Sequence, residues 1–380
     1  MRNLIIAVIV IGVIYLNIKD RTYNSSTLIF GTSIPQTGIM KAWGSAVHSG
    51  ANAYFSYVND TNLLKDKKIQ LITYDDKYEP ELTFENLQRL ISKQNIFALF
   101  GFVGTPTVKN ILPYLNTHDI PFVAPFTGAS FLRTSQNENI INFRSSYQEE
   151  IDSIVNYLHT KKDISRFAVF YQNDEYGEEG FISLLNALNK RDLKLVGEGT
   201  YKRNTLSIRH AFNEIKDAKP QAVIMVGAYK SNALFIKTAK EHENFKDTIF
   251  CNVSFSDADQ MIQELDFNTQ NLLFSQIVPY YKNNSIHVIL EYKKLMRKYY
   301  PNEPLSFISL ESFLAAKSVV LALQNIKGSI TRNKFLEELK TLKKDALKGL
   351  SLEFKNRQLH NKTYLFEYKR GDFIKVNDEN

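Results

Sequence analysis

Six short segments rich in glycine, hydroxyl and aromatic residues follow apolar runs in this chain, and they carry its clearest binding chemistry. Small residues let backbone amides approach a ligand, and hydroxyls at a helix start can bind an anion. The same residue types are also common at the start of helices that bind nothing. A binding role therefore requires several segments to face one cleft. They are 33–38 (SIPQTG), 101–107 (GFVGTPT), 125–130 (PFTGAS), 173–177 (NDEYG), 227–231 (GAYKS) and 252–256 (NVSFS).

Groups that could catalyse a reaction are scattered along the chain. The seven histidines form no H-E-x-x-H pair, and neither a G-x-S-x-G elbow nor a glycine-rich phosphate loop is present. Asp75 and Asp76 could imitate an acid/base or metal pair, but adjacent carboxylates after a strand more often cap the next element. The single cysteine, Cys251, excludes an internal disulfide and a cysteine-based zinc site. We therefore expect no catalytic residue, no metal and no cofactor; a Rossmann-like enzyme is the least favoured class.

Alternating strands and helices must position the six segments. The apolar runs are short and continuous, which is typical of parallel strands covered by helices on both faces. Amphipathic helices are predicted between them, for example over 43–59, 176–190 and 231–241. Ligands bind beyond the carboxyl ends of such strands. The predicted strands are 28–33, 69–74, 96–102 and 120–124 in the first half, and 166–171, 194–197, 222–227 and 248–252 in the second.

Two βαβ sets in sequence predict an α/β fold with two doubly wound, Rossmann-like lobes, each around a parallel central sheet. The length of 380 residues suits two such lobes. The net charge of +7 is modest, and the lysines form no dense stripe interleaved with aromatics, which argues against nucleic-acid binding.

After the second set the chain changes character. Residues 272–281 (LLFSQIVPYY) are extended, helices are predicted near 285–300, 308–326 and 331–343, and short antiparallel strands are predicted around 369–372. This order indicates that the chain returns to the first lobe before it ends on the second.

The N-terminus carries an export signal. Met1 and Arg2 precede a 13-residue apolar run, 4–16, which fits a signal peptide and is short for a membrane span. No A-x-A site and no lipobox cysteine follow, so the run could stay uncleaved as a short anchor. A buried first strand is disfavoured because residues 17–27 are polar. We expect the rest of the chain to lie in the periplasm.

From about residue 27 to its end, the chain resembles the periplasmic solute-binding proteins of the branched-chain amino acid type, which serve ABC importers. The marks of this resemblance are ordered along the chain: PQTG…WG near 35–44, YDD at 74–76, FGFVGTPT at 100–107, IPFVAPFTGA at 120–129, NFR at 142–144, NDEYGEEG at 173–180 and VGAY at 226–229. The resemblance implies a type I periplasmic binding protein fold, whose lobes close on a ligand about a hinge of three crossing strands.

By this resemblance, residues 1–26 are the signal peptide or anchor with a linker. The first lobe comprises 27–145 and 276–352, and the second lobe comprises 146–275 and 353–380. The crossings are expected near 143–146, 274–278 and 350–354.

The resemblance also assigns roles to single residues. A ligand carboxylate would be held by a hydroxyl and amides at Thr105, Phe126 and Gly128. Two tyrosines would close on the ligand from the second lobe, and aromatic walls would surround its side chain. Trp43, the only tryptophan, is one such wall, unless it is an ordinary core residue. The eight predicted site residues are Trp43, Thr105, Phe126, Gly128, Tyr176, Tyr229, Val253 and, as a looser match, Phe313.

Two of these positions depart from the amino-acid-binding pattern. Gly128 replaces a residue that usually carries a hydroxyl, and Val253 replaces the acidic residue that would pair with the ligand's ammonium. Asp257, four residues on, could substitute for it. Burying an unpaired ammonium costs several kcal/mol. The sequence therefore favours a carboxylate or an amide over a standard α-amino acid.

Two functions fit these observations. The first is capture of a small solute, an amino acid, amide or carboxylate, between the closing lobes and its delivery to an ABC importer through the permease. The second is a ligand-sensing module that partners a membrane kinase, cyclase or chemoreceptor. In both cases we expect a monomer that binds a small molecule without reacting with it.

Overall fold

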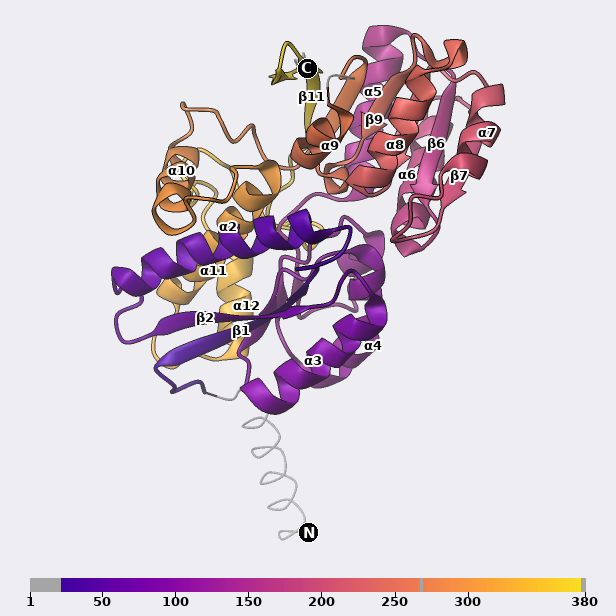
Figure 1. Cartoon of the computed structure of the whole chain (residues 1–380). Coiled ribbons are helices and arrows are strands. Elements are labelled where there is room, and N and C mark those ends of the chain that lie inside the picture. The colour runs from indigo at the N-terminus through magenta and orange to yellow at the C-terminus, as the bar shows by residue number, and fades with distance from the viewer. Residues whose placement is uncertain (1–21, 267–268, 377–380) are drawn as a thin grey trace.

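The structure is a computed structural model that describes residues 22–266 and 269–376. It consists of two α/β lobes side by side, each around its own sheet, as predicted (Figure 1). The predicted export signal at 4–16 lies outside the described residues.

The first lobe contains a five-stranded parallel sheet in the order β2-β1-β3-β4-β5. In its longest pair, β1 and β2, Thr27 lies opposite Lys68 and Ile34 opposite Asp75. Only two residues of the strand predicted at 120–124 form a strand, so the loop that follows it begins one residue earlier than predicted. The strands are β1 (Thr27–Ile34), β2 (Lys68–Asp75), β3 (Ala98–Phe100), β4 (Phe122–Val123) and β5 (Ile140–Ile141).

Helices cover both faces of this sheet. The pair α3 (Pro80–Gln94) and α4 (Thr105–His118) packs through a cluster that includes Leu87, Ile111 and Phe122. On the other side, α2 (Lys41–Asp60) packs against β1, β2 and the later helix α11 (Phe307–Asn325). The α2 helix begins directly after the Thr37–Gly38 turn, so Trp43 lies in its first turn.

The second lobe contains a seven-stranded sheet in the order β12-β11-β10-β9-β8-β6-β7, parallel except for β11 and β12. Its helices are α5 (Tyr147–Lys162), α6 (Glu175–Asn189), α7 (Arg209–Asp217), α8 (Tyr229–Lys240) and α9 (Ala258–Leu265), with 3₁₀ turns η2 (Glu243–Phe245) and η3 (Ser254–Ser256). The strands are β6 (Phe167–Gln172), β7 (Leu195–Tyr201), β8 (Ala222–Val226), β9 (Ile249–Asn252), β10 (Leu272–Gln276), β11 (Tyr364–Lys369) and β12 (Asp372–Lys375).

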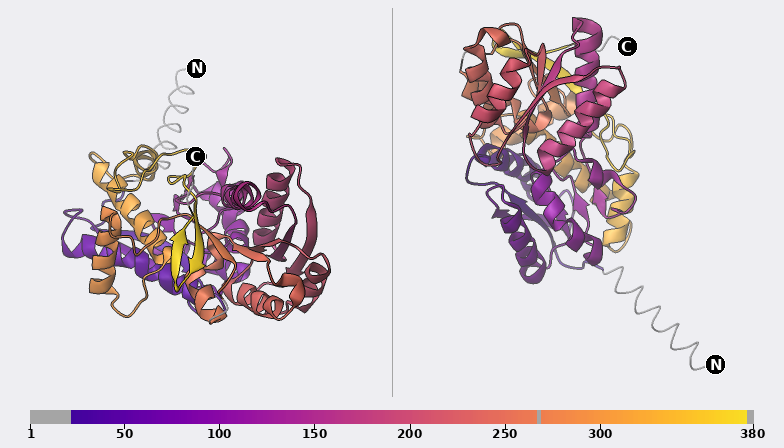
Figure 2. Two further views of the ribbon diagram at one scale, coloured as in Figure 1. Left: turned by 90° about the horizontal axis from the view of Figure 1, so that it is seen from above. Right: turned by 90° about the vertical axis from the view of Figure 1, so that its right-hand side faces the viewer.

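The chain returns to the first lobe after β10 and then back to the second. Helices α10 (His287–Tyr299) and α11 contact α2, and α12 (Arg332–Lys340) packs on α11, whereas β11 pairs antiparallel with β10 (Figure 2). Two of the crossing segments run side by side, because the Asn142 amide donates to the Arg357 carbonyl and the His360 amide to the Phe143 carbonyl. The third crossing therefore pairs at 357–360, later than the predicted 350–354. The exact lobe boundaries remain a prediction.

Among the described residues, α11 alone is long and apolar enough to cross a membrane, but 89% of its most apolar stretch is buried inside the protein. It therefore forms the central core helix of the first lobe.

Candidate functional site

An aromatic cluster packs between the two lobes, and several of its ring contacts join one lobe to the other. Its first-lobe members are Trp43, Tyr78 and Phe126, and its second-lobe members are Tyr147, Tyr176 and Phe255. All six side chains are buried. We call these six residues the cleft cluster.

Phe255 of η3 joins the lobes within the cleft cluster. Its ring stacks on Trp43 at a centroid distance of 4.6 Å and lies 4.8 Å from the ring of Tyr176. Its carbonyl accepts a hydrogen bond of 3.2 Å from the indole Nε1 of Trp43. Trp43 thus lies at the interface between the lobes, and its ring also makes a T-shaped contact with Phe126.

The residues that the resemblance assigns to a ligand carboxylate lie beside the cleft cluster. Thr105 opens α4, where backbone amides have no intrahelical acceptor. Its hydroxyl lies 2.7 Å from that of Thr127 and 3.5 Å from that of Tyr147. The amide of Phe126 already donates to the Phe102 carbonyl at 2.8 Å, so Phe126 offers this site its ring and not its N–H.

Gly128 is required by close packing. A Cβ built on it would lie 2.6 Å from the Tyr147 amide nitrogen, and the Gly128 carbonyl accepts a hydrogen bond from that amide. The hydroxyl missing at this position is present one residue earlier, at Thr127. Glycine is therefore needed at position 128 because the first residue of α5 packs directly against its backbone.

We expect Gly128→Ser to destabilise the protein by about 1–3 kcal/mol, because the new side chain must displace backbone atoms. Chemical denaturation monitored by circular dichroism measures the change. Unchanged stability would show that α5 can shift and that glycine is not needed.

Four predicted site residues remain, and not all of them belong to the cleft cluster. Tyr176 belongs to the cleft cluster, and Tyr229 reaches across the cleft to donate to the Ile39 carbonyl at 2.6 Å. Val253 is buried just before η3. Phe313 packs against Tyr54 and Tyr292 between α2, α10 and α11. This position is inside the first lobe and outside the cleft cluster, because residue 313 lies more than a turn into α11.

A buried charged network lies next to the cleft cluster and was not predicted. Arg144, on the first crossing segment, has its Nε 3.1 Å from Oε1 of Glu311 and donates from Nη2 to the Ser254 hydroxyl at 2.6 Å. Glu150 accepts hydrogen bonds from the amide and hydroxyl of Ser254 and from the hydroxyl of Ser275. One sequence signal existed: Glu150 shares a helix face with apolar residues at 154 and 158.

One donor of this region, Nη1 of Arg144, has no acceptor among the described residues, and Arg144 is 1% exposed. The buried hydroxyl of Tyr176 lies beside the Ser256 side chain but makes no hydrogen bond of normal geometry there. Buried polar groups are normally hydrogen-bonded. Nη1 of Arg144 therefore marks a place where an acceptor would be stabilised.

Asp75 and Asp76 have structural roles, but the expectation that they cap the next element was wrong, because α3 begins after Glu79 and Asp76 is buried. Asp75 accepts hydrogen bonds from the amides of Gln36 and Thr37 and from the Thr37 hydroxyl, which fixes the turn before α2. Asp76 is buried and accepts from Ser33, Tyr78 and Thr83. No group of three or more metal-binding side chains occurs in the described part of the chain.

Burial makes stability depend on pH. It raises the pKa of Asp257 to about 8 and that of Glu311 to about 7, and it lowers the pKa of His360 to about 4. The acids contribute stability that is present at low pH and lost as pH rises through their folded-state pKa values. The histidine contributes stability that is lost as pH falls below about 6.5.

We therefore expect the melting temperature to fall between pH 6.5 and 8.5, as measured by scanning calorimetry. Asp257→Asn should flatten this slope near pH 8. A melting temperature that rises across this range would contradict the assignment.

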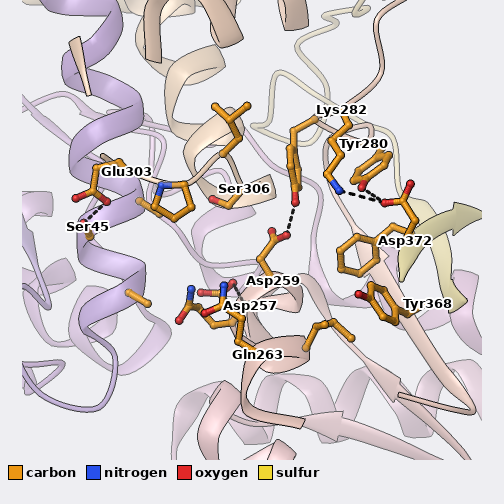
Figure 3. A pocket seen from close by; sticks show the side chains of 18 of the residues that line it. Ser45, Asp257, Asp259, Gln263, Tyr280, Lys282, Glu303, Ser306, Tyr368 and Asp372 are labelled. Carbon is orange, nitrogen blue, oxygen red and sulfur yellow. Dashed lines mark hydrogen bonds and ion pairs between the residues drawn. The ribbon is translucent and has the colours of Figure 1, made fainter. Parts of the chain in front are cut away.

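A second feature between the lobes is an open cavity of about 450 Å³ at the edge of the cleft (Figure 3). Ser45 and Glu303 line it from the first lobe, and Asp257 and Asp259 from the second. Tyr280 and Lys282, from the second crossing, close one side. We call it the rim cavity. None of the eight predicted site residues lines it.

Residues 27–372 match the family of periplasmic binding proteins. The chain belongs to this family. Its similarity to leucine/isoleucine/valine-binding relatives identifies it as a type I periplasmic binding protein of the branched-chain amino acid type. Its place is thus the periplasm and its role is to bind a small solute.

Known relatives of this periplasmic binding protein agree on the fold. A crystal structure described as a possible leucine/isoleucine/valine-binding protein from Rhodopirellula baltica SH 1 is 32% identical, with a TM-score of 0.87, over 92% of this chain and 96% of that one. Leu/Ile/Val-binding protein homolog 7 of Brucella abortus is 21% identical over 80% of this chain and 78% of the relative. The receptor-type adenylate cyclase ESAG 4 of Trypanosoma brucei brucei is 24% identical over 48% of this chain but only 16% of its own length.

Proposed function

We propose that this binding protein captures a small carboxylate or amide with an apolar body between its lobes and delivers it to an ABC importer, without catalysing a reaction. The observation that carries the proposal is Nη1 of Arg144, a buried donor without an acceptor among the described residues, next to the cleft cluster. An acceptor group of a ligand would satisfy this donor, and the rings would cover the apolar body.

A free ammonium fits this cleft less well. Val253 is apolar, and Asp257 lines the rim cavity. The buried carboxylates nearby already have partners, since Glu311 faces Arg144 and Glu150 accepts from Ser254 and Ser275. These contacts favour an acid or amide over its α-amino analogue.

Isothermal titration with matched ligands tests this choice. The set is 3-phenylpropionate, 3-phenylpropionamide, phenylalanine, 4-methylpentanoate and leucine. We expect at least one acid or amide to bind near 1 μM, about −8 kcal/mol, and more tightly than its amino-acid counterpart. Tighter binding of leucine or phenylalanine, or no binding across the set, would reject the proposed ligand class.

A hydroxyl deletion tests the site. Tyr176→Phe removes a buried hydroxyl and keeps the ring, so affinity should fall about tenfold with little change in stability. Tyr171→Phe is the matched control, because its hydroxyl binds Glu198 on the outer side of the second lobe. Equal effects of the two substitutions would place the ligand elsewhere.

A sensing role is the second candidate, and the match to a receptor-type adenylate cyclase favours it. The apolar run 4–16 would then hold the protein at the membrane. Uptake of radiolabelled ligand in cells with and without this gene separates the two roles: importer function requires uptake to depend on the gene. Membrane fractionation with and without residues 4–16 tests the anchor, and size-exclusion chromatography tests the expected monomer.

A further inference from the structure

Acidic side chains outnumber basic ones around the rim cavity. Four carboxyl groups line it, those of Asp257, Asp259, Glu303 and Asp372, and Lys282 is the only lysine or arginine among the described residues of its lining. The ammonium of Lys282 is itself paired with Asp372 at 3.3 Å. A cation in this cavity would favour the ionised form of Asp257, whose pKa burial raises to about 8. Figure 3 shows these side chains around one space.

The carboxylate of Asp257 lacks the partners that a buried charge needs. Asp257 is 3% exposed, and its Oδ1 accepts one hydrogen bond, from the Gln260 amide at 3.2 Å. Its Oδ2 receives no hydrogen bond from any residue that the structure describes, and Asp257 lines the cavity. Asp259, by contrast, accepts from the Tyr281 hydroxyl and the Phe307 amide. A ligand that donates a hydrogen bond inside the cavity would give Oδ2 of Asp257 a partner.

The walls of the rim cavity indicate an organic cation. Aromatic rings of Tyr280, Tyr368 and Phe373 line it together with Pro304 and Leu305. Tyrosine rings attract cations, and the Lys282 ammonium already lies 5.5 Å from the Tyr280 ring centre. The described residues contain no cluster of three or more ligands suited to a metal ion. A volume of about 450 Å³ is that of a small-molecule site.

We propose that the rim cavity is a second ligand site, distinct from the cleft cluster, that binds a small organic amine with its ammonium at Asp257 and its apolar body against the aromatic wall. Both lobes contribute lining residues, Ser45 and Glu303 from the first and Asp257 from the second. An amine bound there therefore contacts both lobes and favours their closed arrangement.

Titration of the full chain with 2-phenylethylamine tests this proposal, with 2-phenylethanol as the neutral analogue of the same shape. We expect saturable binding of the amine and at least tenfold weaker binding of the alcohol. Asp257→Asn should lower the affinity for the amine at least tenfold. Glu264→Gln is the matched control, since Glu264 is on α9, which Asp257 caps, pairs with Lys230 at 3.9 Å and does not line the cavity.

Three results would overturn the proposal: no binding of the amine, equal binding of amine and alcohol, or equal affinity in wild type and Asp257→Asn. Calcium chloride is titrated in parallel, and Asp257-dependent calcium binding without amine binding would also reject an amine site. If Asp257→Asn does not fold, Glu303→Gln tests the same cavity from the first lobe, and unchanged affinity there rejects the site. Cleft ligands play no part in this experiment, so failure of the proposed function would leave its result interpretable.

Discussion

Replacement of Arg144 by methionine is expected to lower the free energy of unfolding by about 3–5 kcal/mol. Arg144 is 1% exposed and connects the first crossing segment to Glu311 of α11 and to Ser254 of the second lobe. Its removal leaves Glu311 buried without its cation and Ser254 without a donor. Urea denaturation of wild type and variant measures the loss.

The double variant Arg144→Met/Glu311→Met should recover most of that stability, because replacing a buried ion pair by apolar residues is often close to neutral. Lys190→Met is the surface control: its partner Asp152 is 3.4 Å away, but Lys190 is 60% exposed, so the expected loss is at most about 1 kcal/mol. If Arg144→Met costs no more than this control, the network does not stabilise the hinge.

Replacement of Trp43 by alanine is expected to weaken ligand binding by about 30-fold or more, equivalent to about 2 kcal/mol, with a smaller effect on stability. Much of the Trp43 ring contact is with Phe255 of the opposite lobe, and the cluster between α3, α4 and the first sheet does not include Trp43. Titration with the best acid or amide of the matched set measures the binding loss.

Phe55→Ala provides the contrast within the same helix. Phe55 packs against Phe30 and Phe100 inside the first lobe, so its loss should cost about 3–5 kcal/mol of stability. If Trp43→Ala destabilises as much as Phe55→Ala, Trp43 is a core residue and its proposed binding role is wrong.

Trp43 also reports on closure directly. It is the only tryptophan in the chain, so its fluorescence belongs to one site. Lobe opening would break the indole hydrogen bond to the Phe255 carbonyl and expose the ring. A ligand that changes lobe closure should therefore shift the emission maximum, whereas a constant spectrum on saturation would place Trp43 away from the moving interface.

Much of the fold was predictable because local patterns repeat along the chain. Short apolar runs followed by helix-start residues predicted both sheets and the position of α2, including the turn before Trp43. The return of the chain was visible in the change of pattern after residue 272. The third crossing was placed several residues early, because no periodicity marks the register between 142–143 and 357–360.

Site residues could be predicted only where they belong to a sequence motif that follows a strand. Tyr176 and Thr105 follow strands, and the structure places both in or beside the cleft. Phe313 was assigned from a loose match, but its ring lies among helices of the first lobe. Phe255, Arg144 and Glu311 were missed because their contacts join elements more than a hundred residues apart.

The sequence by itself determined the family, the two-lobe α/β architecture and the absence of common catalytic motifs, because strand and helix periods, turn residues and motif spacing are local properties. Only the tertiary structure decided that Gly128 is a packing glycine, that Arg144 is left with a free donor, and that Asp257 lines a separate cavity. Burial, partner geometry and the pKa values that follow from them depend on contacts between both lobes, and no local pattern specifies those contacts.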